Sequence, residues 1–213
     1  MSLLNSREQA ADASATYVDT LAAHYKEAGA KKDAKPPVLV LHAGHYSSEK
    51  WQETGTIDAL TQAGAYVVAV DLPSYGKTGG EKLFNAEDRV KFLQAFLAAV
   101  KLEKVLIMSA GYGGIFAVPF IASYPDRVVG YITASGIGLE EAGHELVERT
   151  DLTMPVLVVW GGNNFPQSTA AKIYSWVFPN SELTIFENGG INCYLEEPEK
   201  FNDVVVNFYQ SRL

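Results

Sequence analysis

The chain has 213 residues, of which 47% are hydrophobic and 20% charged, as in an ordinary globular domain with a sizeable core. Its 17 basic and 25 acidic residues give a net charge of −8, which argues against a nucleic-acid partner. The single cysteine excludes an internal disulfide framework, and the longest uncharged apolar run, IFAVPFIA, is too short to cross a bilayer. We therefore expect a cytoplasmic protein without membrane insertion.

The first 36 residues are the least regular part of the chain. Tyr17, Val18, Leu21 and Tyr25 fit either one face of a helix or an antiparallel hairpin that precedes the rest of the fold. No internal repeat, low-complexity segment or linker follows. The sequence therefore predicts one domain.

From residue 37 onward, short apolar runs alternate with segments of helical periodicity. The runs are continuous and rich in β-branched residues, which is typical of parallel strands covered on both faces. Between them, residues 90–100 and 201–209 each place apolar side chains on one helical face. This alternation predicts an α/β fold with a mostly parallel sheet and helices on both faces. The predicted strands are 38–41, 66–70, 105–108, 131–133, 156–160 and 183–186.

Functional sites in open parallel sheets lie beyond the carboxyl ends of the strands. After the predicted strand 105–108 comes SAGYGG, residues 109–114, and then an apolar helical segment. A strand, a glycine-rich turn and a helix in this order are the layout of a nucleophile elbow, G-x-S-x-G, whose tip carries a serine. In this chain the tip is Gly111, so the nucleophile of such an elbow is missing.

Five motifs together resemble the α/β-hydrolase superfamily and, within it, the α/β-hydrolase domain-containing protein 14 family. This resemblance covers residues 37–213 and implies an α/β-hydrolase fold with a minimal lid, because only residues 134–155 join two of the strands. It also implies that residues 1–36 form the opening β-hairpin of the family, packed on the main domain. The motifs are YSSEKWQ (46–52), DLPSYGKT (71–78), GGIFAVPF (113–120), YPDRV (124–128) and CYLEEPE (193–199).

The resemblance also locates a Ser-Asp-His triad, and all three positions are substituted. Gly111 stands at the nucleophile, Asn164 at the acid and Ile191 at the histidine that precedes CYL by two residues. Ser109 is expected to stay inside the strand, and no histidine lies in the last strand-end loop. Because triad catalysis needs a hydroxyl, an imidazole and a carboxylate in contact, we expect no hydrolysis of this type.

The three replacements agree with one another physically. Asn164 removes a carboxylate that would be unpaired without the histidine, Ile191 adds apolar volume, and Gly111 relieves backbone strain at the tip. Backbone N–H groups of Tyr112 and of Gly44 or His45 are expected to keep an oxyanion-hole-like arrangement. The sequence thus predicts a pocket lined by Gly44, His45, Tyr112, Asn164 and Ile191.

Three functions remain open. The first is a non-hydrolytic protein, a pseudoenzyme, that binds a small molecule or a protein partner at this pocket. The second is a cofactor-independent lyase or isomerase that uses His45, Tyr112 or Asn164, and the third is residual esterase activity. No cofactor is expected, and one cysteine without a helical histidine pair predicts no metal site. His42, Asp71 and Cys193 are predicted to be structural, as a backbone-bonded imidazole, a turn-stabilising carboxylate and a small buried filler.

Overall fold

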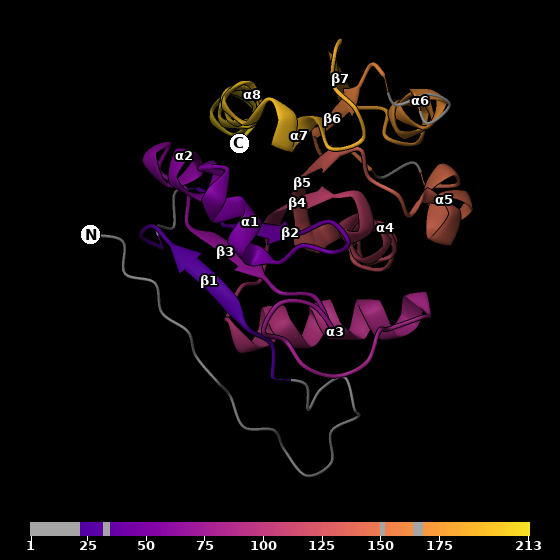
Figure 1. Ribbon diagram of the computed structural model, residues 1–213. Coiled ribbons are helices and arrows are strands. Elements are labelled where there is room, and N and C mark those ends of the chain that lie inside the picture. Colours follow the sequence, from indigo (N-terminus) through magenta and orange to yellow (C-terminus); the bar gives the residue numbers. More distant parts are fainter. Residues whose placement is uncertain (1–21, 32–34, 150–151, 164–167) are drawn as a thin grey trace.

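A computed structural model describes residues 22–31, 35–149, 152–163 and 168–213 (Figure 1). These residues form a seven-stranded sheet in the order β1-β3-β2-β4-β5-β6-β7. The strands are β1 (Tyr25–Ala28), β2 (Val38–Leu41), β3 (Val67–Val70), β4 (Val105–Ala110), β5 (Val128–Ala134), β6 (Val156–Gly161) and β7 (Ser181–Phe186). The helices are α1 (Ser48–Glu53), α2 (Thr56–Gln62), α3 (Ala86–Ala99), α4 (Gly114–Ser123), α5 (Leu139–Val147), α6 (Ser168–Val177), α7 (Cys193–Glu196) and α8 (Pro198–Arg212), with short 3₁₀ turns η1 (Gly111–Gly113) and η2 (Pro125–Arg127).

Six of the seven strands are parallel, and these are the six that the apolar runs predicted. β4 and β6 are buried along their whole lengths, which explains why their sequences are continuously apolar rather than alternating. The predicted α/β fold with a mostly parallel sheet is therefore confirmed. β5 begins three residues before the predicted 131–133, because Val128 already pairs with Val105 of β4.

The first strand, β1, is the antiparallel member of the sheet and pairs with β3, with Tyr25 opposite Val70. Its partner in the sheet is thus not the next strand in sequence. Residues 1–21 lie outside the described part of the chain, so the β-hairpin proposed for residues 1–36 stays a prediction there.

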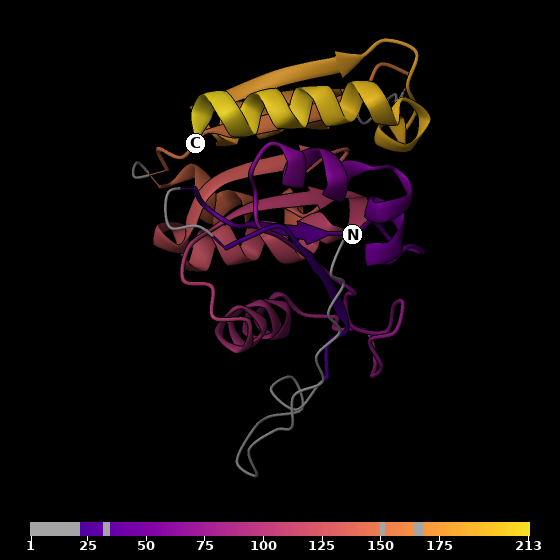
Figure 2. The ribbon, with the colours of Figure 1, turned by 90° about the vertical axis from the view of Figure 1, so that its left-hand side faces the viewer.

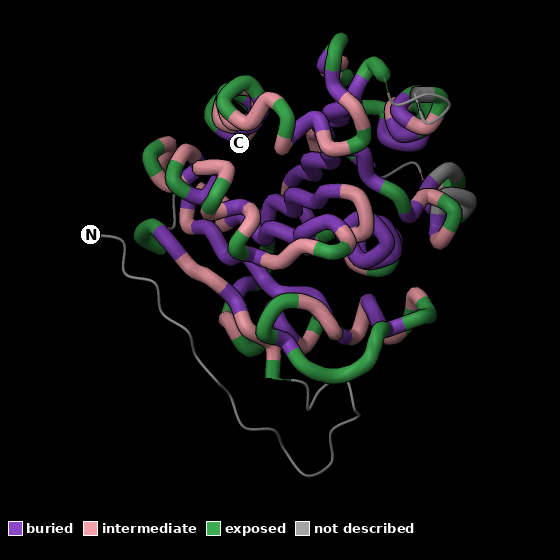
Figure 3. Tube along the Cα trace, in the orientation of Figure 1, coloured by how far each residue is buried: buried purple, intermediate pink, exposed green. Residues whose placement is uncertain are grey.

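Helices cover both faces of the sheet, and each face has its own hydrophobic core (Figure 1). One core joins the sheet to α3, α4, α5 and α6, and its large members include Phe92, Phe116 and Tyr174. The other joins it to α1, α2, α7 and α8 through Trp51, Tyr194 and Phe201. Figure 3 shows the central strands buried between these layers. The loops that follow the carboxyl ends of the parallel strands are where the site is expected.

Candidate functional site

The turn after β4 has the geometry of an elbow. β4 ends at Ala110, η1 turns the chain, and α4 leaves in a new direction. Gly111, at the tip, has φ +43°, a left-handed conformation that costs a residue with a side chain on the order of 1–3 kcal/mol. A glycine adopts it with little strain. The strand-turn-helix layout inferred from the sequence is therefore present, and its tip carries no side chain.

Ala43, in the loop after β2, lies against this tip. A Cβ added at Gly111 would be 3.2 Å from the Cβ of Ala43, which is closer than ordinary van der Waals contact. The two positions are thus coupled in space: the methyl group of Ala43 occupies the room beside the position of a nucleophile's Cβ. The sequence alone does not show that these two residues adjoin.

Backbone strain gathers at the carboxyl edge of the sheet. Of the four described non-glycine residues with positive φ, three follow parallel strands: His45 (67°) after β2, Ser74 (68°) after β3 and Ser135 (46°) after β5. With Gly111 after β4, the loops that follow four neighbouring strands each contain a left-handed residue. Such residues concentrate at functional sites, where the surrounding structure holds them in place. This edge is therefore the candidate site on structural grounds as well.

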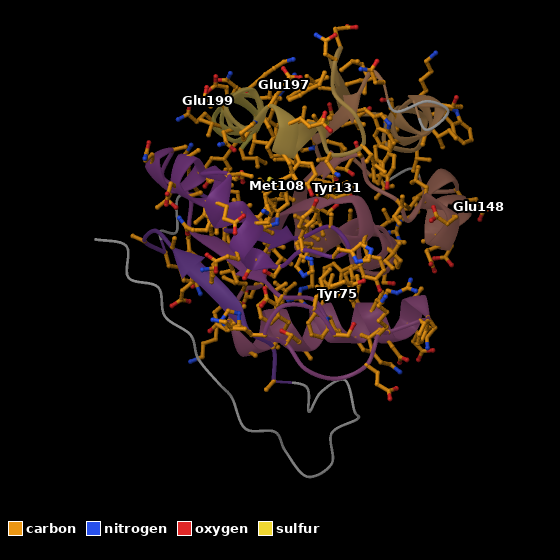
Figure 4. The ribbon with its side chains drawn as sticks, in the orientation of Figure 1. Tyr75, Met108, Tyr131, Glu148, Glu197 and Glu199 are labelled. Carbon is orange, nitrogen blue, oxygen red and sulfur yellow. The ribbon has the colours of Figure 1, made fainter. Side chains whose placement is uncertain are left out.

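Ser109 is confirmed as part of the strand rather than the site. Its side chain is fully buried, and its Oγ lies 2.9 Å from the phenolic oxygen of Tyr131 on β5. Tyr131, a residue of β5, is labelled in Figure 4. A serine in this position has no exposed hydroxyl, so it cannot replace the missing nucleophile at the tip.

The imidazole of His42 is held by backbone groups on both of its nitrogens. Nδ1 donates to the carbonyl of Ala43 at 2.8 Å, and Nε2 accepts from the N–H of Leu72 at 2.9 Å. Burial lowers the pKa of His42, an effect larger than the opposing influences of Ala43 and Asp71. The ring is therefore neutral and has no nitrogen left for catalysis, which confirms the structural interpretation.

Asp71 is likewise structural. Its carboxylate accepts from the N–H of Ser48 at 2.7 Å and of Lys77 at 2.9 Å, and Nδ1 of His24 lies 2.9 Å away. Burial raises the pKa of Asp71, but the hydrogen bonds from Lys77 and Ser48 and the nearby His24 outweigh it and lower the pKa overall. Asp71 thus ties β1, α1 and the loop 71–78 together.

An aromatic wall stands beside the elbow. The ring of Tyr75, from the loop 71–78, lies 5.4 Å from both the His42 and the Tyr112 rings, and Tyr112 packs on Phe116 at 5.8 Å. Figure 4 labels Tyr75 between the sheet and α3. Burial raises the pKa of Tyr112, so its phenol stays protonated at neutral pH. The predicted pocket does not include Tyr75, although Tyr75 lies in the DLPSYGKT motif, residues 71–78.

The predicted pocket residues are brought together in part. A Cβ on Gly44 would lie 3.5 Å from Cβ of Tyr112, so these two adjoin, and His45 follows in an exposed turn. Ile191 lies in the loop after β7 and is 53% exposed. Asn164 lies outside the described residues. The pocket as a whole therefore stays a prediction.

Cys193, two residues after Ile191, is fully buried, and burial raises its pKa to about 11. A protonated, inaccessible thiol fits the predicted filler. Within the described ranges, no three His, Cys, Asp or Glu side chains gather in a way that would hold a metal ion. None of the helices in that part of the chain is long and apolar enough to span a membrane.

Comparisons with known proteins agree with this geometry. Residues 36–149 match the family model described as "alpha/beta hydrolase fold". The chain is 27% identical over 176 residues to "Putative protein-lysine deacylase ABHD14B" of Rattus norvegicus, covering 81% of this chain and 82% of that protein. It is 26% identical over 172 residues to "Protein ABHD14A" of the same species, covering 80% and 70%.

Solved structures with the same fold include hydrolases. A "predicted CIB-like hydrolase" from Thermoplasma acidophilum superposes with a TM-score of 0.84 at 21% identity, covering 97% of this chain and 99% of that one. The esterase RhEst1 from Rhodococcus sp. ECU1013 superposes with a TM-score of 0.79 at 18% identity, covering 98% and 99%. At these identities the likeness concerns the fold alone.

Proposed function

The chain belongs to the alpha/beta hydrolase fold family, and we propose that it is a non-hydrolytic member that binds a small molecule where its relatives carry their triad. The observation that carries this proposal is Gly111, which occupies the elbow tip at φ +43° and has no nucleophile to offer. Losing a whole triad costs on the order of 10⁶-fold in kcat, so no useful hydrolysis remains.

Other groups near the tip do not supply a substitute. Ser109 is buried against Tyr131, and both nitrogens of His42 are engaged by the backbone. The raised pKa of Tyr112 disfavours the phenolate that a lyase or isomerase base would require. These observations favour binding over esterase chemistry and over a lyase or isomerase whose base is Tyr112.

The chemistry of the site favours a ligand with one hydrogen-bond acceptor and an apolar body. Among the described residues, no hydrogen bond uses the N–H groups of Gly44, His45 or Tyr112. The N–H of Tyr112 also lies at the start of the helical segment that continues into α4, where the helix dipole attracts negative charge. A carboxylate or an acyl carbonyl fits such donors. The name of one relative, "Putative protein-lysine deacylase ABHD14B", points to the same ligand class, an acyl group.

The apolar part of the ligand would meet Tyr75, Tyr112 and two isoleucines. Ile137 is 44% exposed and Ile191 is 53% exposed, so neither side chain is packed away into the interior. Exposed apolar side chains beside a few polar groups are the usual composition of a small-molecule site.

Two measurements test the proposal. A fluorophosphonate probe should not label the protein, and p-nitrophenyl acetate turnover should equal that of a Ser109→Ala control. Binding is measured by thermal shift with acetate, butyrate and an N-acetyl-lysine peptide. A ligand at 100 times its Kd should stabilise the fold by about 2.7 kcal/mol.

Gly44→Val provides the matched site variant. A Cβ at Gly44 meets Tyr112 only at an ordinary 3.5 Å, so the added side chain is tolerated and projects beside the aromatic wall. It should abolish the ligand-induced shift, whereas Gly79→Val, where nothing lies within 4 Å, should preserve it. Probe labelling with robust turnover, or no shift with any of the three ligands, would contradict the proposal.

A further inference from the structure

The hydroxyl of Tyr75 lies close to a backbone donor of the ligand site. Its oxygen is 3.9 Å from the point that a Cβ on Gly44 would occupy, and the Cβ of Tyr112 lies 3.5 Å from the same point. Within the described residues, neither this hydroxyl nor the N–H of Gly44 takes part in a hydrogen bond. Both groups are hydrogen-bond donors. Two unused donors therefore adjoin one residue that has no side chain.

The loop between β3 and α3 fixes the backbone of Tyr75. The N–H of Tyr75 donates to the carbonyl of Leu72 at 2.9 Å, and its carbonyl accepts from the N–H of Thr78 at 3.0 Å. Gly76 follows at φ +55°, and a Cβ there would lie 2.2 Å from Oδ2 of Asp71, so this turn requires a glycine. Figure 2 shows the loop on the side of the molecule toward which the parallel strands point. The backbone of Tyr75 is thus held at the edge of the sheet that carries the site.

The ring of Tyr75 is fixed as well. Its centroid lies 5.4 Å from the ring centroids of His42 and Tyr112 and 5.4 Å from Nζ of Lys82. After burial, the nearby Tyr75 is the next cause that raises the pKa of Tyr112, so the two phenols lie within electrostatic reach of each other. A side chain that is held in place before a ligand arrives loses little conformational freedom on binding, which strengthens its contact with the ligand.

We propose that Tyr75 determines the ligand class of this site: its hydroxyl binds one oxygen of a carboxylate whose other oxygen accepts from the N–H of Gly44. This inference rests on the ligand site proposed above. A carboxylate suits the two donors because it presents two acceptor oxygens on one carbon, whereas a ketone presents one. Hydrogen bonds to an ionised group are also about twice as strong as those between neutral groups. The site should therefore prefer an aliphatic carboxylate to a neutral carbonyl compound of the same shape.

The experiment is a titration of the full chain with butyrate and with 2-pentanone, followed by the amide signals in ¹H–¹⁵N NMR spectra at neutral pH. The ketone has the shape of butyrate but carries a methyl group in place of one carboxylate oxygen. Wild type should bind butyrate more tightly than 2-pentanone, with a large shift of the Gly44 amide signal. Tyr75→Phe removes only the hydroxyl, so it should weaken butyrate binding about 10- to 100-fold and change the Kd of 2-pentanone less than about twofold.

Two controls separate binding from folding. Because the hydroxyl of Tyr75 has no hydrogen bond within the described residues, Tyr75→Phe should leave Tm unchanged. Tyr124→Phe removes a hydroxyl that lies 3.3 Å from Oε1 of Gln94, at the opposite end of α4 from the elbow. This variant should bind both ligands as wild type does.

The possible failures are distinguishable. Equal affinity of wild type for the two ligands, or an equal effect of Tyr75→Phe on both, would overturn the role of Tyr75 and leave the ligand site standing. Binding of neither ligand by wild type would contradict the ligand site itself, and this inference with it.

Discussion

Adding a methyl group at the elbow tip should destabilise the fold by an amount that the geometry at Gly111 allows us to estimate. The positive φ costs on the order of 1–3 kcal/mol, and the reduced freedom of the unfolded chain returns about 0.4–1 kcal/mol. Overpacking against Ala43 adds about 1–3 kcal/mol. Gly111→Ala should therefore cost about 1–6 kcal/mol, which lowers Tm by about 2–24 °C in a chain of this size.

Two other glycines separate the contributions. Gly64 has φ +93° with no atom within 4 Å of an added Cβ, so Gly64→Ala measures the conformational cost alone. Gly79 has neither a positive φ nor a near neighbour, and Gly79→Ala should be neutral or slightly stabilising. Urea and thermal unfolding should rank the variants as Gly79→Ala, Gly64→Ala and Gly111→Ala, from most to least stable.

The contact with Ala43 is tested by a double variant. Combining Ala43→Gly with Gly111→Ala should remove the overpacking contribution and leave only the cost of the positive φ. Relative to Ala43→Gly, the double variant should therefore lose about as much stability as Gly64→Ala loses relative to wild type. A Gly111→Ala protein as stable as wild type would refute the strained-tip reasoning. Equal losses with and without Ala43→Gly would refute the contact.

Ser109→Ala should cost about 1–3 kcal/mol in urea unfolding, because the buried hydroxyl of Tyr131 loses its hydrogen bond to Ser109, and should not change any background esterase rate. Asp71→Asn should destabilise the protein near neutral pH and flatten its acid dependence. The lowered folded-state pKa of Asp71 means that its contribution is present above the usual aspartate pKa of about 3.9 and is lost as pH falls through the folded value. A wild type and variant with parallel stability curves below pH 5 would contradict this assignment. Cys193, with a pKa of about 11, should react with a thiol reagent at pH 8 only after unfolding, and rapid labelling of the folded protein would contradict its burial. Gly111→Ser alone should give no hydrolysis, since Ile191 stands at the base position; the smallest set able to restore any is Gly111→Ser, Asn164→Asp and Ile191→His, with Ala43→Gly to make room.

The sequence determined the parallel part of the fold because strands that are buried on both faces consist of continuous runs of apolar residues. The apolar runs at 38–41 and 156–160 mark strands whose every residue is buried. The same holds at the elbow, where a strand, a glycine-rich turn and an apolar helix adjoin along the chain. The identity of Gly111 at its tip is likewise a fact of the sequence alone.

Contacts between residues that are far apart in the chain were decided only by the tertiary structure. Spacing along the sequence does not tell how far Ala43 lies from Gly111. Only the sheet, which sets β2 beside β4, shows that a Cβ added at Gly111 would lie 3.2 Å from the Cβ of Ala43. β1 pairs with β3 rather than with the next strand for the same reason. The position of β7 at an edge likewise depends on the strand order of the sheet, because a strand's own residues are the same whether its edge is covered or open.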